Sequence, residues 1–175
     1  MSGQAVPYSS AMREEIVAWV AGLPPPLAVM VLATLPILEL RGAIPLARQV
    51  WGMSAWEALG WSLLGNALPV PFILALLGPV SRWAAGHWGW LHRFLERIFD
   101  HSRRRHSERF ERLRDLALIT FVAVPLPITG AWSGALAAFV FGVPFWRALV
   151  LVLLGVVIAG VVVTVATAGG RALLG

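Results

Sequence analysis

The sequence contains no cysteine and no lysine, and it contains few charged residues of any kind. The absence of cysteine excludes disulfides, thiol chemistry and cysteine-ligated metals. Charged residues make up 13% of the 175 residues, whereas soluble domains carry about 25%. Hydrophobic residues make up 58%, and the mean hydropathy is +0.76. Because so small a polar share cannot cover a packed soluble core, we predict an all-α integral membrane protein that forms one domain over residues 1–175.

The formal net charge is +5, and the arginines gather beside the apolar segments. A basic chain can bind nucleic acid, but arginines that flank membrane segments usually mark their cytoplasmic side. We therefore expect no nucleic-acid partner. We expect the arginine-rich linker, residues 85–115, to form an amphipathic helix in the cytoplasm.

Apolar segments of two lengths divide the chain. Residues 1–26 include a short amphipathic segment that we expect to form a helix at the membrane interface. Two long blocks, residues 55–83 and 145–168, reach the length of about 20 residues that a spanning helix needs. Two shorter arms precede each long block: residues 27–38 and 42–51 before the first, and residues 116–126 and 131–143 before the second.

The two halves of the chain are similar to each other. The segment WGMSAWEALGWSLLG from Trp51 aligns with FGVPFWRALVLVLLG from Phe141. We therefore predict two repeats, residues 27–84 and 116–175, each made of a re-entrant helical hairpin and one spanning helix. Each repeat crosses the membrane once, an odd number of times, so the second repeat must be inverted relative to the first. Inverted repeats with broken helices are typical of secondary transporters.

The first hairpin carries charge at its centre, in the segment LPILELRGAIPLA. Charged side chains and irregular backbone are tolerated at that depth only inside the protein or beside a wet cavity. We expect Gly42 to allow a sharp reversal there, and Pro36 and Pro45 to end the broken helices. Glu39 can take up a proton, and Arg41 offers a planar fork for phosphate or carboxylate. The alternative is a structural pair in which Glu39 and Arg41 only neutralise each other.

The second tip, VPLPITGAWSGAL, carries no charge. Pro125 and Pro127 break the arm, and Thr129 can hydrogen-bond either freed backbone groups or a ligand. Gly130 begins a GxxxG pattern with Gly134, which usually indicates close helix packing. The backbone amides at the start of the following arm could also bind an anion.

Other polar residues have two interpretations each. Asn66 lies in the middle of the first long block. Its side chain either makes a hydrogen bond that helps helices pack or supplies a polar group to a cavity. Glu57 and Arg147 occupy nearly equivalent positions at the starts of the long blocks, which favours anchoring at the membrane boundary. The four histidines do not share a helical face, so no metal site is predicted. Without cysteine and without a histidine or aspartate pair near Glu39, we expect no enzyme activity, no catalytic residue and no cofactor.

ELRGAIPLA in the first half, GN followed by PxP in the first long block, and PLPITGAWSGALAA in the second half resemble the bacterial family of putative small multidrug export proteins. The resemblance implies export and a multi-pass location in the bacterial inner (plasma) membrane. The site residues that it implies are Glu39, Arg41, Gly42, Pro45, Asn66, Pro125, Pro127, Thr129 and Gly130. The layout of two opposed re-entrant hairpins is also similar to the DedA family, which includes polyprenyl-phosphate carrier translocases. That family typically carries arginine in its second tip, which is neutral here.

These observations favour a small secondary transporter or flippase that is proton-coupled through Glu39. Arg41 would bind an anionic amphipathic substrate, either a lipid phosphate such as a polyprenyl-phosphate carrier or a drug-like compound. The expected partners are the lipid bilayer, such a substrate and protons, and so few helices also suggest a homodimer. The alternative is a non-transporting membrane scaffold that binds its partners through the basic cytoplasmic linker. Charge reversal at Arg103, Arg104 and Arg105 would then damage function more than a change at Glu39.

Overall fold

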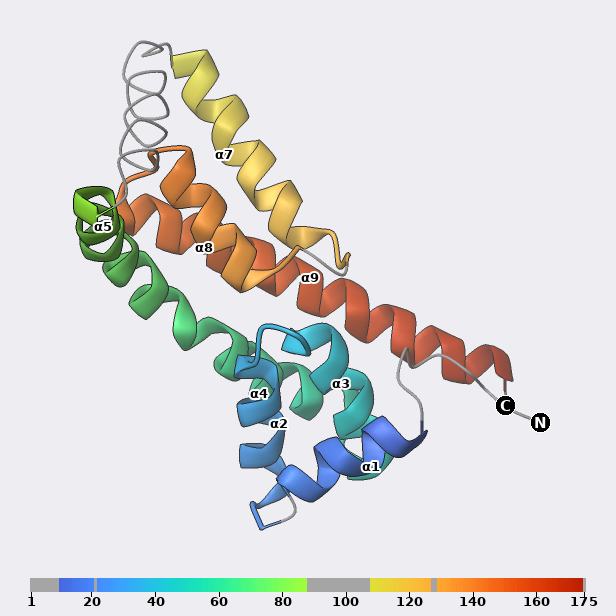
Figure 1. The fold of residues 1–175 in the computed structure, drawn as a ribbon. Coiled ribbons are helices and arrows are strands. Elements are labelled where there is room, and N and C mark those ends of the chain that lie inside the picture. Colours follow the sequence, from blue (N-terminus) through green and yellow to red (C-terminus); the bar gives the residue numbers. More distant parts are fainter. Residues whose placement is uncertain (1–9, 21, 88–107, 127–128, 175) are drawn as a thin grey trace. The chain divides into compact units, whose positions relative to one another are not determined.

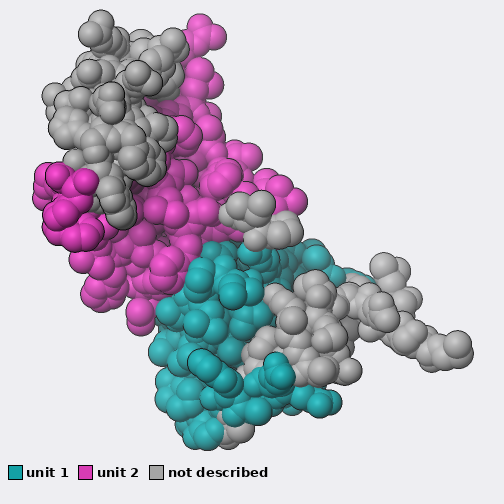
Figure 2. Space-filling view, in the orientation of Figure 1, with its two compact units in different colours: residues 1–66, 159–175 teal, residues 67–158 magenta. Residues whose placement is uncertain are grey.

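The computed structural model describes all residues except 1–9, 21, 88–107, 127–128 and 175, and the part that it describes is helical and contains no strand (Figure 1). The predicted all-α class is confirmed. Contacts divide the chain into unit 1, residues 1–66 and 159–175, and unit 2, residues 67–158 (Figure 2). The single domain stays a prediction. Pro127 and most of the predicted cytoplasmic linker lie outside the described residues.

Unit 1 is built around a helical hairpin. After α1 (Ser10–Trp19), the hairpin is formed by α2 (Pro25–Thr34) and α3 (Glu39–Val50), and α4 (Ala55–Ala67) and the last part of α9 (Phe145–Leu174) complete the unit. Proline suits the first turn of α2, because the N–H that it lacks would have no helical partner there. The helices α2 and α3 pack along each other (Figure 1), and most of α3 is buried.

Unit 2 contains α5 (Pro69–His87), α7 (Glu108–Ala123), α8 (Ala131–Val140) and the first part of α9. The helix α8 packs against both α5 and α7. A Cβ atom on Gly134 would lie 2.4 Å from Cγ2 of Val122, and one on Gly155 would lie 2.6 Å from Cβ of Val122. Both glycines therefore allow helices to pack closely, which is the role that the GxxxG pattern indicates for Gly134.

The first hairpin reverses earlier than the sequence suggested. We predicted that Gly42 makes the reversal, but the chain turns over residues 35–38 and α3 begins at Glu39. Gly42 is a buried helical residue whose N–H donates to the carbonyl of Leu38 at 2.9 Å, and Pro45 lies inside α3 rather than at its end. Both predictions are wrong. The residue with left-handed backbone at the reversal is Glu39, with a φ of 47°, and α3 continues past Pro45.

The second hairpin also begins earlier than predicted. Its first helix, α7, starts at Glu108 rather than at residue 116, so the charged residues 108–115 belong to the hairpin and not to a separate linker. A helix can begin in this polar segment because its first turns are formed by glutamate and arginine, which are good helix formers.

The two aligned segments share local features. The helices α3 and α8 each end two residues before an aligned glycine, and both glycines, Gly52 and Gly142, have a φ of 63°. Only glycine adopts this backbone without strain. The aligned Gly65 and Gly155 both admit a neighbouring helix: a Cβ atom on Gly65 would lie 2.0 Å from the carbonyl oxygen of Met30 in α2, and one on Gly155 would overlap with α7. The sequence similarity is thus accompanied by similar backbone and similar packing.

In the described part of the chain, two helical segments are long and apolar enough to cross a membrane. These are Ala55–Trp83, formed by α4 and most of α5, and Phe145–Gly169 in α9. They agree with the predicted spans. The core helix of a soluble protein would be mostly buried, whereas only 22% of the most apolar window of the first segment is buried. Its exposed side chains, which include Leu64, Phe72 and Leu76, are suited to contact with lipid.

Candidate functional site

Glu39 occupies an unusual position at the start of α3. Its φ of 47° lies in the left-handed region, which residues other than glycine adopt rarely and at a cost of about 1–2 kcal/mol. Its backbone N–H donates to the carbonyl of Leu35 at 2.9 Å, which closes the turn, and its side chain is only 5% exposed. Strained backbone of this kind is concentrated at functional sites. A buried carboxyl at such a turn is therefore a candidate for function.

Arg41 lies on the first turn of α3 and is half-buried, with its Nη1 atom inside the protein. Gly42 and Pro45 are buried further along the same helix. Pro45 has no N–H to donate to the carbonyl of Arg41, so the helix is locally weakened beside the charged residues. Unit 1 therefore brings together four of the predicted site residues within two turns of one helix.

Asn66 belongs to the same part of unit 1, because a hydrogen bond joins the end of α2 to α4. Pro69 cannot donate an N–H to the carbonyl of Gly65, and the hydroxyl of Thr34 donates to that carbonyl instead, at 2.9 Å. This bond places the end of α2, just before the turn that leads to Glu39, beside Gly65, the residue that precedes Asn66. The Asn66 side chain is 1% exposed, and its Oδ1 atom has no hydrogen-bond partner among the described residues. Of the two roles considered for Asn66, this favours a polar group available to a ligand.

The second tip, in unit 2, is closed by Thr129. Its hydroxyl donates to the carbonyl of Val124 and accepts the N–H of Leu126 at 3.0 Å. Its own N–H donates to the carbonyl of Leu126 at 3.2 Å. The hydroxyl therefore satisfies backbone groups that the break in the helix frees, which is the first of the two roles that the sequence allowed. Pro125 is exposed on this turn, and Gly130 is buried immediately before α8.

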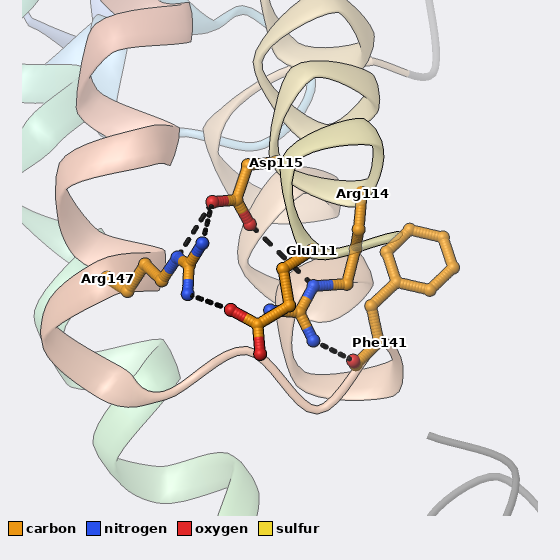
Figure 3. A network of polar contacts seen from close by, with 5 residues as sticks. All are labelled: Glu111, Arg114, Asp115, Phe141 and Arg147. Carbon is orange, nitrogen blue, oxygen red and sulfur yellow. Dashed lines mark hydrogen bonds and ion pairs between the residues drawn. The ribbon is translucent and has the colours of Figure 1, made fainter. Parts of the chain in front are cut away.

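A charged cluster that the sequence did not predict joins α7 to the start of α9 within unit 2 (Figure 3). Arg147 donates from Nε to Oδ2 of Asp115 at 2.7 Å and from Nη1 to Oε2 of Glu111 at 2.6 Å. Arg114 donates to the carbonyl of Phe141 at 3.4 Å, and its Nε lies 3.7 Å from Oδ1 of Asp115. Two acids four residues apart share one face of α7, which was the available sequence signal. Their partner on α9 could not be identified from spacing alone.

Glu57, which aligns with Arg147, has a local role instead. The N–H of Ser54 donates to Oε2 of Glu57 at 3.0 Å, and the N–H of Glu57 donates to Oγ of Ser54 at 3.3 Å. This reciprocal pair is a capping box that satisfies free N–H groups at the start of α4. It fits the boundary position expected for Glu57.

Replacing Arg147 with methionine is expected to lower the free energy of unfolding by about 1–3 kcal/mol. The loss arises because Asp115, whose side chain is 16% exposed, would keep its charge without its main partner. Thermal unfolding in detergent measures the change, with Glu57→Gln as the control at the aligned position, where we expect a smaller change because Glu57 is exposed and makes only a local helix cap. A double-mutant cycle with Asp115→Asn isolates the ion pair, and strictly additive losses would contradict the prediction.

A comparison with known protein families gives a match over most of the chain. Residues 39–162, well over half of the chain, match the family described as putative small multi-drug export protein. The chain belongs to this family. The match begins at Glu39, the first residue of α3, and includes the second tip, so the resemblance to the small multi-drug export family is confirmed. No curated protein and no solved structure matches the chain. Membership in the small multi-drug export family, together with the two long apolar helices, indicates that the protein is membrane-associated. The family's description names export as its function.

Proposed function

We propose that this member of the small multi-drug export family is a small secondary transporter or flippase of the bacterial inner (plasma) membrane. It moves an anionic amphipathic substrate, such as a polyprenyl-phosphate lipid carrier or a drug-like compound, and it is coupled to protons. The observation that carries the proposal is the buried carboxyl of Glu39, two residues from Arg41 in an apolar hairpin. Ionisable groups inside membrane proteins are costly to keep and are usually functional.

The proposed arrangement in the membrane is two inverted repeats, similar to the DedA layout, with re-entrant hairpins formed by α2–α3 and α7–α8. The lengths of α2, α3 and α8 support it, because helices of 10, 12 and 10 residues are too short to cross a bilayer, which requires about 20. The shared backbone of Gly52 and Gly142 supports a repeat. The arginine-rich linker lies in the cytoplasm in this arrangement, and a homodimer would supply further helices around the transport path.

Each tip residue has a distinct role in this proposal. The planar guanidinium of Arg41 binds the anionic headgroup in two parallel hydrogen bonds, and the carboxyl of Glu39 takes up and releases the coupled proton. Because the hairpins are broken helices, they can move against the long helices and open the site to either side in turn. Thr129 and Gly130 shape the second tip, and the N-terminal end of α8 beside them would favour an anion.

The test is movement of polyprenyl phosphate between the leaflets of proteoliposomes, with and without a proton gradient. Wild-type protein is expected to accelerate movement when the gradient is present. Glu39→Gln is expected to reduce this acceleration to background, because an amide cannot carry the proton. Arg41→Ala is expected to reduce it through loss of headgroup binding. Glu57→Gln is the matched control, since Glu57 is an exposed acid engaged in a helix cap, and it should retain wild-type movement.

Other outcomes have distinct meanings. Movement by Glu39→Gln at the wild-type rate would remove Glu39 from the mechanism and contradict proton coupling through it. No movement by folded wild-type protein would contradict the lipid-phosphate substrate and leave amphipathic drug-like anions to be assayed in the same vesicles. The scaffold alternative gains support only if charge reversal at Arg103, Arg104 and Arg105 damages function in cells while Glu39→Gln does not.

A further inference from the structure

Two polar side chains of α4 are buried with oxygens that have no hydrogen-bond partner among the described residues. These oxygens are Oγ of Ser62 and Oδ1 of Asn66. Ser62 is 0% exposed and Asn66 is 1% exposed, so neither oxygen is reached by bulk solvent. Buried polar groups are paired in the great majority of cases, and each exception needs an explanation. The backbone packing described above uses neither oxygen.

The two oxygens lie on the same face of α4. Residues four apart on a helix lie one above the other, so a single ligand can contact both side chains. On the same helix, Gly65 contacts α2 and Leu59 contacts the last part of α9. At about 100° of rotation per residue, Ser62 and Asn66 point into the sector between these two contacts, inside unit 1.

The site lies near the charged turn of the first hairpin. The hydroxyl of Thr34 donates to the carbonyl of Gly65, the residue before Asn66, and the N–H of Glu39 donates to the carbonyl of Leu35, so the end of α2 just before the turn is held beside α4. Glu39, which follows this turn, is also buried in unit 1.

We infer that Ser62 Oγ and Asn66 Oδ1 bind an alkali-metal cation. Hydroxyl and amide oxygens are hard ligands, which suit such ions and not the softer transition metals. Divalent Ca²⁺ is usually held by carboxylates, and neither Ser62 nor Asn66 supplies one. Among the described residues, no group of three histidine, aspartate or glutamate side chains could hold a metal ion either. Side chains four apart on one helix can share an ion, as in helical metal motifs.

The test is thermal unfolding of the full chain in detergent, in sodium, potassium or choline chloride at equal ionic strength. An alkali cation at about ten times its Kd is expected to raise the Tm by about 3–6 °C over choline, because it binds only the folded state. The rise should saturate with concentration. It should disappear in Ser62→Ala and in Asn66→Ala. Because the readout is binding, the result does not depend on whether Glu39 couples transport to protons.

Two features keep the experiment decisive. Ser62→Ala removes an unpaired buried hydroxyl, so it is expected to fold and to be at least as stable as wild type in choline. Ser81→Ala is the control, since its hydroxyl in α5 already donates to the carbonyl of Gly78 at 2.8 Å, and it should keep the full cation effect. Equal Tm values for wild type in all three salts would overturn the inference. A cation effect that persists in Ser62→Ala would overturn it too.

Discussion

Replacing Gly65 with alanine is expected to lower the apparent Tm of the detergent-solubilised protein by about 10 °C. The added Cβ atom would lie 2.0 Å from the carbonyl oxygen, 2.8 Å from the carbonyl carbon and 2.9 Å from the Cα atom of Met30. All three are backbone atoms of α2, so no side chain can rotate away and the helix itself must shift. The shift would also stretch the hydrogen bond from Thr34 to the Gly65 carbonyl.

Gly60 provides the matched control for this prediction, because it lies on α4 as well and an added Cβ atom there meets nothing within 4 Å. Gly60→Ala is therefore expected to leave the Tm unchanged or to raise it slightly through higher helix propensity. Size-exclusion chromatography after heating measures the folded fraction of each variant. If Gly65→Ala is as stable as Gly60→Ala, the close packing of α2 on α4 is contradicted.

Single cysteines at Val50 and Val140 are expected to react with a membrane-impermeant maleimide from opposite sides of the membrane. The two valines are the last residues of α3 and α8, they precede the aligned Gly52 and Gly142, and they are 37% and 39% exposed. The sequence contains no other cysteine, so each variant carries one thiol. Val50→Cys should react in intact spheroplasts. Val140→Cys should react only after permeabilisation, because inverted repeats place equivalent points on opposite sides.

Blocking with a permeant reagent before labelling gives the background for both variants. Equal labelling of Val50→Cys and Val140→Cys in intact spheroplasts would rule out inverted repeats. Labelling of Val140→Cys alone from outside would keep the repeats inverted and would reverse the predicted orientation of the arginine-rich linker.

The long helices could be predicted from the sequence, whereas the details of the tips could not. A run of apolar residues long enough to span a bilayer is a local signal, and both predicted blocks agree with the observed helices. The turn before α3 was misplaced because Gly42 is the residue that best tolerates left-handed backbone. In the structure, α3 packs against α2 with Gly42 buried inside the helix, and the left-handed conformation falls on Glu39.

The candidate site was predicted in part for a related reason. Glu39, Arg41 and Asn66 could be selected because charge or amide is rare within apolar segments. Ser62 could not, since serine is common in membrane helices and only its burial without a partner distinguishes it. The contacts of Arg147 also depend on which distant segments meet in space. A single sequence reports the spacing of Glu111 and Asp115 on one helix but not the helix that lies against them.

The hydrogen bond from Thr34 to the carbonyl of Gly65 also has a consequence for membrane insertion in the proposed arrangement. Because Pro69 supplies no N–H, α4 and α5 would enter the bilayer with a carbonyl that lacks its helical partner, and lipid offers no replacement. The hydroxyl that satisfies it belongs to a hairpin synthesised earlier. We therefore expect the long helix to satisfy the Gly65 carbonyl only when it meets the first hairpin, and a chain in which the two fail to meet would leave that polar group exposed in the bilayer.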